Sequence, residues 1–331
     1  MIPFEWLEQA QERIAPYVVE TPLTHDKERG LYLKWENRQL TGSFKARGAL
    51  NKVLSLEDWE RDAGLVAASA GNHGQGVALA GTLTRSRVEV FVPEHAVSSK
   101  VEAIRRQGAG VRTVPGGYGE AELAAKHYAE AEHKTYISPY NDPQVIAGQG
   151  TMAMEIMRQL ASLENEHGES RDARRGVAAW IVPTGGGGLI SACGVVLANS
   201  GAMPELIGVQ AAASAFTHSL YHHQTQNAVE DNPTLADGLS GAIDENSVTI
   251  PIMRQLVKDM LVVSEGSIAA AIAFAWNIYH ERIEGSGAVG LAAILDGQIT
   301  LRACVLVMTG GNIEEEVFRA ITTSHAGEKW N

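Results

Sequence analysis

Residues 178–188 read AAWIVPTGGGG, and residues 189–198 continue as LISACGVVLA. An apolar run that ends in glycines and continues into an apolar segment of helical length predicts a strand, a tight loop and a helix. A similar order occurs at LVAAS (65–69), which precedes AGNHGQG, and at ACVLVM (303–308), which precedes TGGN. The sequence therefore predicts three strands that each end in a glycine-containing loop.

Two more apolar runs, VEVFVP (88–93) and ELIGVQ (205–210), have the length of buried strands. Alanine-rich stretches with helical spacing lie between the strand-like runs, at 74–83, 119–133 and 264–280. Alternation of strands and helices predicts an α/β fold with parallel-rich sheets flanked by helices. We see no internal repeat, and we interpret the polar segment 161–176 as a helix end and an exposed loop.

The three glycine-containing loops predict a ligand site. In open α/β sheets, ligands bind outside the carboxyl ends of the strands. The run from Gly185 to Gly188 would let the backbone approach an anion, with the N-terminus of the next helix directed at it. The run has neither the spacing of a dinucleotide site nor the Gly-Lys-Ser/Thr of a Walker loop, so a small phosphate monoester fits better. The alternative is a flexible turn.

Lys45 lies in ENRQLTGSFKARGALNKV (36–53), at the predicted start of a helix. An ordinary surface lysine is the alternative interpretation. The positive end of the helix dipole and partial burial would both favour the neutral amine, which a Schiff base requires. A Schiff-base lysine, a phosphate-binding glycine loop and the lack of a metal motif together indicate pyridoxal 5′-phosphate as the cofactor.

Composition excludes several classes of function. The 331 residues carry a formal net charge of −12 without a clustered basic stripe, which argues against nucleic acid as a partner. No apolar run reaches the length of a membrane span, and the N-terminus lacks the pattern of a secretory signal. The chain has two cysteines, Cys193 and Cys304, both in apolar settings. We expect a cytoplasmic protein with a small-molecule substrate.

Several motifs, in their order and spacing, carry a resemblance to a known family over nearly the whole chain. They are KWENRQLTGSFKARGA (34–49), SAGNHGQGVA (69–78), VIAGQGTMAMEI (145–156), TGGGGLISA (184–192), TLADGL (234–239) and MTGGN (308–312). The chain resembles the fold type II pyridoxal-phosphate enzymes, whose fold is similar to the tryptophan synthase β subunit. Within them it resembles the serine/threonine dehydratases, or threonine ammonia-lyases.

This resemblance implies a role for each matching residue. Lys45 would bind the cofactor covalently and then act as the catalytic base at Cα. The other cofactor-binding residues would be Phe44 on the ring, Asn72 at the phenolic oxygen, Gly185, Gly186, Gly187 and Gly188 at the phosphate, Thr309 at the pyridine nitrogen, and Gly238 and Glu284 nearby. The substrate carboxylate would be bound by Ser69, Gly71, Asn72 and His73. Phe44 could instead belong to the core, and His73 could be a loop histidine bonded to the backbone.

The resemblance also implies the domain organisation. We expect a large cofactor-binding domain at 1–63 and 148–331, a small domain at 64–147, and a cleft for the cofactor between them. A homodimer is expected on the same ground. Because the chain ends about twenty residues after TGGN, we expect no C-terminal regulatory domain.

If Thr309 meets the pyridine nitrogen, as the resemblance implies, its hydroxyl supports β-elimination. A carboxylate at the pyridine nitrogen would keep it protonated, whereas a hydroxyl does not stabilise that charge. A carbanion at Cα should then expel a leaving group from Cβ. The expected products are ammonia and a 2-oxo acid: 2-oxobutyrate from L-threonine, or pyruvate from L-serine.

Departures from the family pattern narrow this expectation. Racemases of this fold carry a serine where this chain has Ala70, which has no proton to transfer. Relatives with a divalent-cation site place carboxylates where this chain has Gln210, Ser214 and Phe216, so we expect no such site. The family's Glu-Pro is replaced by Glu284 and a glycine.

Three histidines need separate consideration. His218 and His222 have the i, i+4 spacing of helical metal ligands, with His223 beside them. No glutamate follows the first histidine and no third ligand is evident, so we predict a solvated helix face and no metal.

Alternative functions remain open. The same chemistry could act on another 3-hydroxy amino acid, such as 3-hydroxyaspartate, phenylserine or a hydroxyectoine-derived compound, with residues 211–243 shaping the choice. A β-replacement enzyme or a non-catalytic pyridoxal-phosphate binder is the more distant alternative.

Overall fold

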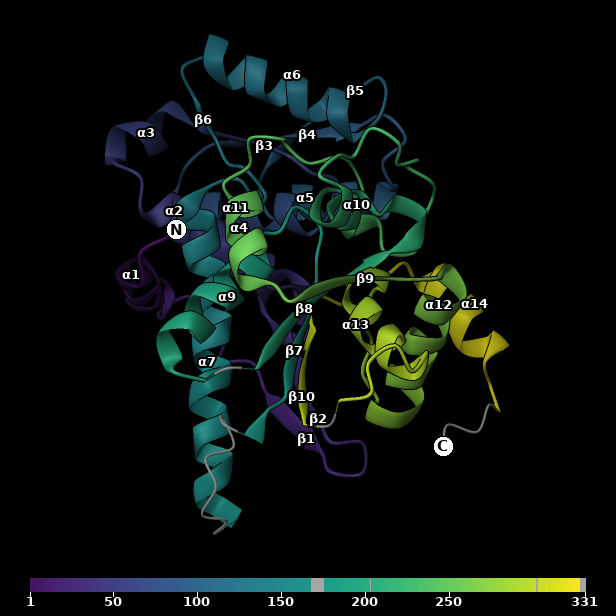
Figure 1. Ribbon diagram of the computed structural model, residues 1–331. Coiled ribbons are helices and arrows are strands. Elements are labelled where there is room, and N and C mark those ends of the chain that lie inside the picture. The colour runs from purple at the N-terminus through teal and green to yellow at the C-terminus, as the bar shows by residue number, and fades with distance from the viewer. Residues whose placement is uncertain (168–175, 203, 302, 328–331) are drawn as a thin grey trace.

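The computed structural model describes residues 1–167, 176–202, 204–301 and 303–327 (Figure 1). Its strands form two sheets, of six and four strands. The strands are β1 (Leu23–Asp26), β2 (Leu31–Trp35), β3 (Leu65–Ala68), β4 (Val88–Pro93), β5 (Gly110–Val114), β6 (Thr135–Tyr136), β7 (Ala179–Pro183), β8 (Glu205–Ala211), β9 (Asp259–Val263) and β10 (Cys304–Met308). The α/β fold predicted from the alternating pattern is confirmed.

The order of strands in the larger sheet is β1-β2-β10-β7-β8-β9, and in the smaller sheet β5-β4-β3-β6. All pairings are parallel except that of β1 with β2. The α-helices of the described residues are α1 (Phe4–Ile14), α2 (Lys45–Leu54), α3 (Asp58–Ala63), α4 (Asn72–Thr84), α5 (Ser98–Arg106), α6 (Tyr118–Ala131), α7 (Pro143–His167), α9 (Gly188–Ser200), α10 (Phe216–His223), α11 (Thr249–Leu256), α12 (Glu265–Phe274), α13 (Gly285–Leu295) and α14 (Glu315–Ser324).

Helices cover both faces of the larger sheet. Along β7, Trp180 and Val182 pack into the core shared with α1, α7 and α9, whereas Ala179 and Ile181 pack into the core shared with α12, α13 and α14. Side chains alternate between the faces of a strand, so a strand covered on both faces must be apolar throughout. This requirement explains why the sequence AAWIVP (178–183), from which we predicted the strand, is a continuous apolar run.

The smaller sheet is also covered on both faces. Leu65 and Ala67 of β3 pack towards residues of α2, α4 and α5, whereas Val66 and Ala68 pack towards α6. Figure 1 shows α6 on the outer side of this sheet and α2, α4 and α5 on the side that faces the larger sheet.

The strand composition of the two sheets supports our proposed division into two domains. The smaller sheet draws on residues 65–136, and the larger sheet on residues 23–35 and 179–308. The exact boundaries at 63/64 and 147/148 remain a proposal. Of the polar segment 161–176, the part up to His167 belongs to α7, and residues 168–175 lie outside the described residues.

Two helices connect the regions of the two sheets and cross at glycines. A Cβ on Gly48 of α2 would lie 2.7 Å from the carbonyl oxygen of Val145 in α7, and a Cβ on Gly148 would lie 2.7 Å from the Cα of Gly48. Such distances leave no space for any other residue. The small residues after Lys45 thus let α2 lie directly against α7.

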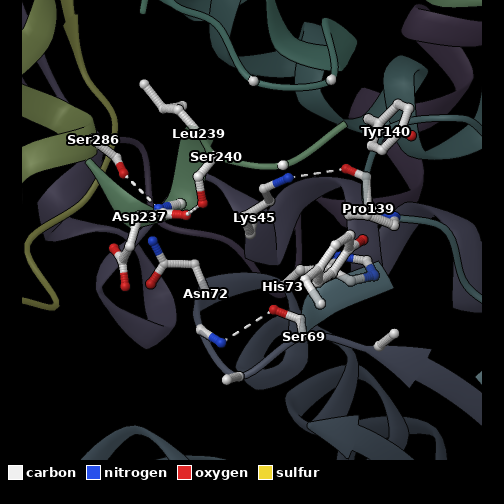
Figure 2. Close-up of a pocket in the computed structure, with 18 of the residues that line it drawn as sticks. Lys45, Ser69, Asn72, His73, Pro139, Tyr140, Asp237, Leu239, Ser240 and Ser286 are labelled. Carbon is white, nitrogen blue, oxygen red and sulfur yellow. Dashed lines mark hydrogen bonds between the residues drawn. The ribbon is translucent and has the colours of Figure 1, made fainter. Parts of the chain in front are cut away.

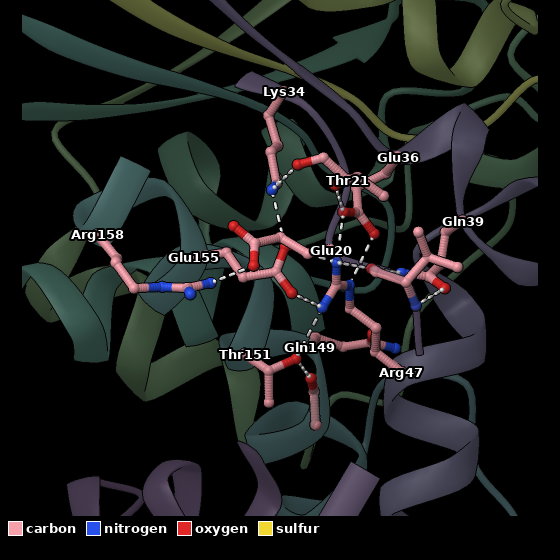
Figure 3. Close-up of polar contacts among 12 residues, drawn as sticks. Glu20, Thr21, Lys34, Glu36, Gln39, Arg47, Gln149, Thr151, Glu155 and Arg158 are labelled. Carbon is pink, nitrogen blue, oxygen red and sulfur yellow. Dashed lines mark hydrogen bonds and ion pairs between the residues drawn. The ribbon is translucent and has the colours of Figure 1, made fainter. Parts of the chain in front are cut away.

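A buried ion network fixes the same helix pair to β2 (Figure 3). Arg47 donates to Glu36 at 2.8 Å and to Glu155 of α7 at 2.7 Å. Lys34 of β2 donates to Glu155 and to the carbonyl of Thr21, both at 2.8 Å. The side chains of Lys34, Glu36 and Arg47 are fully buried. Arg47, two residues after Lys45, therefore fixes the start of α2 to α7 and to the segment after β2.

Among the described residues, no helix is long and apolar enough to span a membrane. Both cysteines, Cys193 and Cys304, are buried as free thiols. His222 and His223 are exposed and His218 is half-buried. His222 lies 2.9 Å from the carbonyl oxygen of Met260 through its Nε2 atom.

Candidate active site

A cavity of about 470 Å³ lies where the loops after β3, β7 and β10 meet (Figure 2). This volume is within the usual range for small-molecule sites. Every residue that we predicted for the site lines this cavity. These residues are Phe44, Lys45, Ser69, Gly71, Asn72, His73, Gly185, Gly186, Gly187, Gly188, Gly238, Glu284 and Thr309. The structure thus brings all of them together, while their individual roles remain predictions.

Lys45 is the first residue of α2, as its sequence context predicted. Its ammonium group donates to the carbonyl of Pro139 at 2.9 Å, which Figure 2 shows across the cavity. Burial lowers the pKa of Lys45 from 10.5 to about 8, and the nearby Glu284 carboxylate opposes this shift. Because burial penalises the charged form, this lysine loses its proton more readily than a surface lysine.

The loop after β10 is held against the segment that leads into α2. The backbone N–H of Phe44 donates to the carbonyl of Thr309 at 3.1 Å, and Ser43 forms an isolated β-bridge with Gly310. The side-chain amide of Asn312 donates to the carbonyl of Thr41 at 2.7 Å. These contacts place buried Thr309 beside Lys45, although 264 positions separate them in the sequence (309 − 45).

Phe44 is partly buried and packs against the core that contains α1, α7 and α9. The Nζ atom of Lys45 lies 5.2 Å from the centroid of the Phe44 ring. Phe44 therefore both lines the cavity and contacts the core, so the two interpretations of this residue are compatible.

Asn72 and Glu284 are hydrogen-bonded to each other in the cavity. The Asn72 amide donates to Glu284 at 2.6 Å, and its carbonyl accepts from Asn312 at 2.7 Å. Burial, and next the negative charge of Asp237, raise the pKa of Glu284 from 4.5 to about 7. An NH₂ group has two hydrogens, so Asn72 retains one for a ligand.

The four-glycine loop forms a cradle in which side chains do not fit. A Cβ on Gly186 would lie 2.3 Å from Cγ of Tyr140, and a Cβ on Gly188 would lie 3.2 Å from the Tyr140 Cα. Gly187 has φ +84° and precedes α9, whose N-terminus has no side-chain cap. Thr249 donates to the Gly186 carbonyl at 2.8 Å, which turns that oxygen towards protein. The uncapped helix end can therefore accept an anion.

The loop after β3 supplies hydrogen-bond donors to the cavity. The Ser69 hydroxyl accepts from the backbone N–H of Gly71 at 3.1 Å, which leaves its own hydrogen available. His73 lies 2.9 Å from the Ile137 carbonyl through Nε2, and burial, followed by the charge of Lys45, lowers its pKa to about 3. Since a carbonyl only accepts, Nε2 carries the hydrogen and the ring is neutral.

The neutral ring of His73 bears on its predicted role. Its single N–H is already used by Ile137, so the imidazole has no donor left for a substrate carboxylate. The alternative interpretation, a loop histidine bonded to the backbone, describes this contact. Donors to a carboxylate in this loop are instead the Ser69 hydroxyl and backbone N–H groups.

The glycine after Glu284 has a structural reason. A Cβ on Gly285 would lie 2.1 Å from the carbonyl oxygen of Leu235, so only glycine lets residues 235–236 approach α13 this closely. Gly238 follows in the same segment, and its N–H donates to the Ser286 hydroxyl at 3.0 Å. The glycine that replaces the proline of the family's Glu-Pro therefore allows this loop to pack closely against α13 at the cavity.

Other departures from the family pattern also have visible contacts. Gln210 accepts from the backbone N–H of His218 at 2.8 Å, and the Ser214 hydroxyl donates to Asp231 at 2.7 Å. Ala70 lines the cavity with a methyl group. In the described part of the chain, no group of three or more His, Cys, Asp or Glu side chains is arranged to hold a metal ion.

Several residues of the cavity wall were not predicted from the sequence. They are Lys100, Tyr118, Pro139, Tyr140, Gln149, Asp237, Leu239, Ser240 and Ser286. TLADGL is one of the motifs that carry the resemblance, but no role was predicted for its Asp237. Nothing in the sequence around Lys100 or Tyr140 distinguishes them from surface residues, because their position depends on how the two sheets meet.

The residues present fit the cofactor indicated by the sequence. An uncapped helix end with a glycine cradle suits a phosphate group, and the half-buried amine of Lys45, with its lowered pKa, suits a covalent bond to an aldehyde. The free hydrogen of Asn72 suits a phenolic oxygen.

Comparisons with known proteins point the same way. The profile of the family described as "Pyridoxal-phosphate dependent enzyme" matches residues 12–310. The L-threonine ammonia-lyase of Thermotoga maritima is 36% identical over 321 residues, which are 95% of this chain and 76% of that protein. The catabolic L-threonine dehydratase of Escherichia coli K12 is 35% identical over 322 residues, 92% of each chain.

A solved structure agrees in fold. The processed form of threonine deaminase isoform 2 from Solanum lycopersicum superposes with a TM-score of 0.85 at 29% identity. The match covers 98% of this chain and 88% of that chain.

Proposed function

Because the chain belongs to the family of pyridoxal-phosphate dependent enzymes, we propose that it is an ammonia-lyase for L-threonine, L-serine or both. It would remove the amino group and the β-hydroxyl group and release ammonia with 2-oxobutyrate or pyruvate. The observation that carries this proposal is Lys45, a half-buried lysine of lowered pKa in the same cavity as the glycine cradle and Thr309.

Pyridoxal phosphate, when bound, withdraws electrons from the amino acid and makes its Cα proton acidic. Lys45 is the group that would take this proton. With a pKa of about 8, about a tenth of the amine is neutral at pH 7, against less than about one part in a thousand for an ordinary lysine. Burial therefore supplies the base form that proton removal requires.

The other residues hold and orient the reactants. The cradle from Gly185 to Gly188, at the start of α9, would bind the phosphate, and Thr309 would meet the pyridine nitrogen. Ser69 and the backbone N–H groups of its loop would bind the substrate carboxylate. A hydroxyl at Thr309 does not favour an additional proton on the ring, so loss of the β-hydroxyl is preferred to transamination.

Racemisation is a poorer fit to the cavity. It requires a second group that returns a proton to Cα, and the loop between Ser69 and Gly71 offers Ala70 at the position where racemases of this fold have serine. Dehydration of another 3-hydroxy amino acid uses the same residues and differs only in the side chain that the cavity accepts.

We further propose that the protein works as a homodimer in the cytoplasm. The dimer rests on the resemblance to the family, and the compartment rests on the two buried free cysteines.

The test is release of 2-oxo acid by purified, cofactor-loaded protein. The panel holds L-threonine, L-serine, D-serine, threo-3-hydroxyaspartate and phenylserine. We expect the highest kcat/KM with L-threonine or L-serine. Release from the bulkier members alone would keep the chemistry and change the substrate, and no release from any member would contradict the proposal.

A further inference from the structure

Lys100 and Asp237 form an ion pair in the wall of the cavity. Lys100 lies in the first turn of α5, and Asp237 begins the short 3₁₀ helix Asp237–Leu239. The Lys100 ammonium donates to the Asp237 carboxylate, and both residues line the cavity. The lysine side chain is 17% exposed and the aspartate side chain 55% exposed. The pair thus joins the region of the smaller sheet to the loop before α13.

The pair lines the same cavity as Lys45 and Asn72. The α5 helix packs on α4, where Ile104 would be 2.9 Å from a Cβ on Gly74, so Lys100 belongs to the same region as the carboxylate-binding loop. Figure 2 shows Asp237 next to Asn72. Asp237 raises the pKa of Glu284, after the larger effect of burial, and Lys100 opposes this rise.

Few cationic side chains are available in this cavity. Among the described residues that line it, the lysines are Lys45 and Lys100, and none is an arginine. Lys45 serves the cofactor, and the pKa of His73 is lowered, so its ring is neutral. The side chain of His95 is 86% exposed and lies 3.5 Å from Glu94. Lys100 is therefore the partly buried cation left for a substrate, and its ammonium group is already paired with Asp237.

We propose that the Lys100–Asp237 pair makes the cavity select 3-hydroxy amino acids with neutral side chains over those with a side-chain carboxylate. The inference rests on the proposed function and narrows its substrate class. A carboxylate on the substrate side chain would have to displace Asp237 from Lys100 or remain unpaired beside a negative charge. L-Threonine and L-serine meet no such cost, whereas 3-hydroxyaspartate does.

The first test uses Asp237→Asn, which frees Lys100 and keeps the shape of the side chain. Two substrates, threo-3-hydroxyaspartate and L-threonine, are compared by the ratio of their kcat/KM values. We expect this ratio to rise about tenfold in the variant, because the ammonium of Lys100, which is only 17% exposed, gains the substrate carboxylate as a charged partner. Lys100→Met, which leaves Asp237 alone in the wall, is expected to lower the same ratio.

A binding measurement makes the test independent of turnover. L-Aspartate and L-2-aminobutyrate lack a β-hydroxyl group and differ in side-chain charge. Their dissociation constants are measured from the change in cofactor absorption of the loaded enzyme. Asp237→Asn should lower the dissociation constant of L-aspartate about tenfold relative to that of L-2-aminobutyrate. Adding Lys100→Met to this variant should abolish this increase in affinity.

The chain offers a matched control in Asp244→Asn. Asp244 pairs with Lys126 of α6 at 3.4 Å, so this pair also joins the smaller-sheet region to the loop after Gly238. Its side chains are 40% and 38% exposed, and neither residue lines the cavity. If the Asp237→Asn effect came from loosening contacts between the two regions, Asp244→Asn would reproduce it. We expect both ratios to stay at the wild-type value in this control.

The outcomes separate the inference from the proposed function. Wild-type protein that uses threo-3-hydroxyaspartate as well as L-threonine would overturn the inference and leave the elimination chemistry intact. Ratios that stay within about twofold of wild type in Asp237→Asn would also overturn it. Absence of any 2-oxo acid release would contradict the proposed function, while the two dissociation constants would still decide whether Asp237 blocks Lys100.

Discussion

The side-chain amide of Asn72 donates a 2.6 Å hydrogen bond to the carboxylate of Glu284, 212 residues later in the chain. This bond joins the first residue of α4 to the residue before α13, and so links the region of the smaller sheet to that of the larger one. Glu284 is buried, and its pKa is raised to about 7 by burial first and by Asp237 second. The protonation state of Glu284 can therefore affect the hydrogen bond that holds Asn72 in the cavity.

Glu284 predicts a pH-dependent stability of the cofactor-free protein. Its folded-state pKa lies above the ordinary value of 4.5, so the folded state binds more protons than the unfolded state between about pH 4.5 and 7. Its contribution is complete below pH 4.5 and is lost as the pH rises through 7. Relative to Glu284→Gln, the wild type should lose up to about 3 kcal/mol of unfolding free energy over this range.

Urea unfolding at pH 4.5 and pH 8 measures this difference. Glu8→Gln, on the exposed face of α1, is the control, and its unfolding free energy should follow that of the wild type at both pH values. Parallel pH profiles for wild type and Glu284→Gln would show that Glu284 has no raised pKa.

Gly186→Ala should weaken cofactor binding. The added methyl would lie 2.3 Å from the Tyr140 ring, so the loop or the ring must move, and the cradle loses its shape. We expect the dissociation constant of pyridoxal phosphate to rise at least about tenfold, measured by equilibrium dialysis. Gly266→Ala is the control, since its methyl would only touch Ser264 at 3.8 Å. Equal affinities for the two variants would refute the assigned cradle.

Arg47→Met should strongly destabilise the fold. It leaves Glu36 and Glu155 buried without their main cationic partner, and such a change costs about 3–5 kcal/mol. Arg158→Met removes the ion pair with Glu20, whose two side chains are 55% and 51% exposed, and should cost less than about 1 kcal/mol. Chemical denaturation measures the unfolding free energy of both variants. Similar losses in the two variants would show that burial does not make the Arg47 ion pairs more important for stability than the exposed Arg158 pair.

Removal of metal ions should leave the elimination rate within about a factor of two. Divalent cations prefer several carboxylate ligands, and the positions at which relatives carry them hold Gln210 and Ser214, which are hydrogen-bonded within the protein. The measurement is 2-oxobutyrate release after exhaustive dialysis against EDTA, with and without added Mg²⁺. A large loss that Mg²⁺ restores would reveal a cation site.

The sequence predicted those elements whose signal is local. The runs at 65–69, 88–93, 178–183, 205–210 and 303–308 became β3, β4, β7, β8 and β10, because strands covered on both faces must be apolar throughout. Strand β5 is mostly exposed, with Val111 and Val114 only half-buried, and β6 has two residues, so neither strand gave such a signal. The stretch 264–280 is α12 up to Phe274 and then a wider π-helical turn at Ala275–Tyr279.

The residues of the candidate site also fall into two groups, those that stand in sequence motifs and those that meet only in the folded structure. Lys45, Asn72 and the four glycines stand in motifs that are visible in the sequence, and the structure places all of them at one cavity. Lys100 and Asp237 form their pair only because α5 and the loop before α13 meet in space. For His73 the sequence left two interpretations open, and the contact with the distant carbonyl of Ile137 matches the one in which the histidine is bonded to the backbone.

The most direct test of the account is the amount of ammonia and 2-oxobutyrate formed from L-threonine by cofactor-loaded wild type and Lys45→Ala. We predict equimolar products from the wild type and a fall of at least about 10³-fold in rate without the Lys45 amine. Lys27→Ala, outside the cavity, is the control and should keep the wild-type rate. Turnover by Lys45→Ala at the wild-type rate, or 2-oxobutyrate formed without ammonia, would contradict the account.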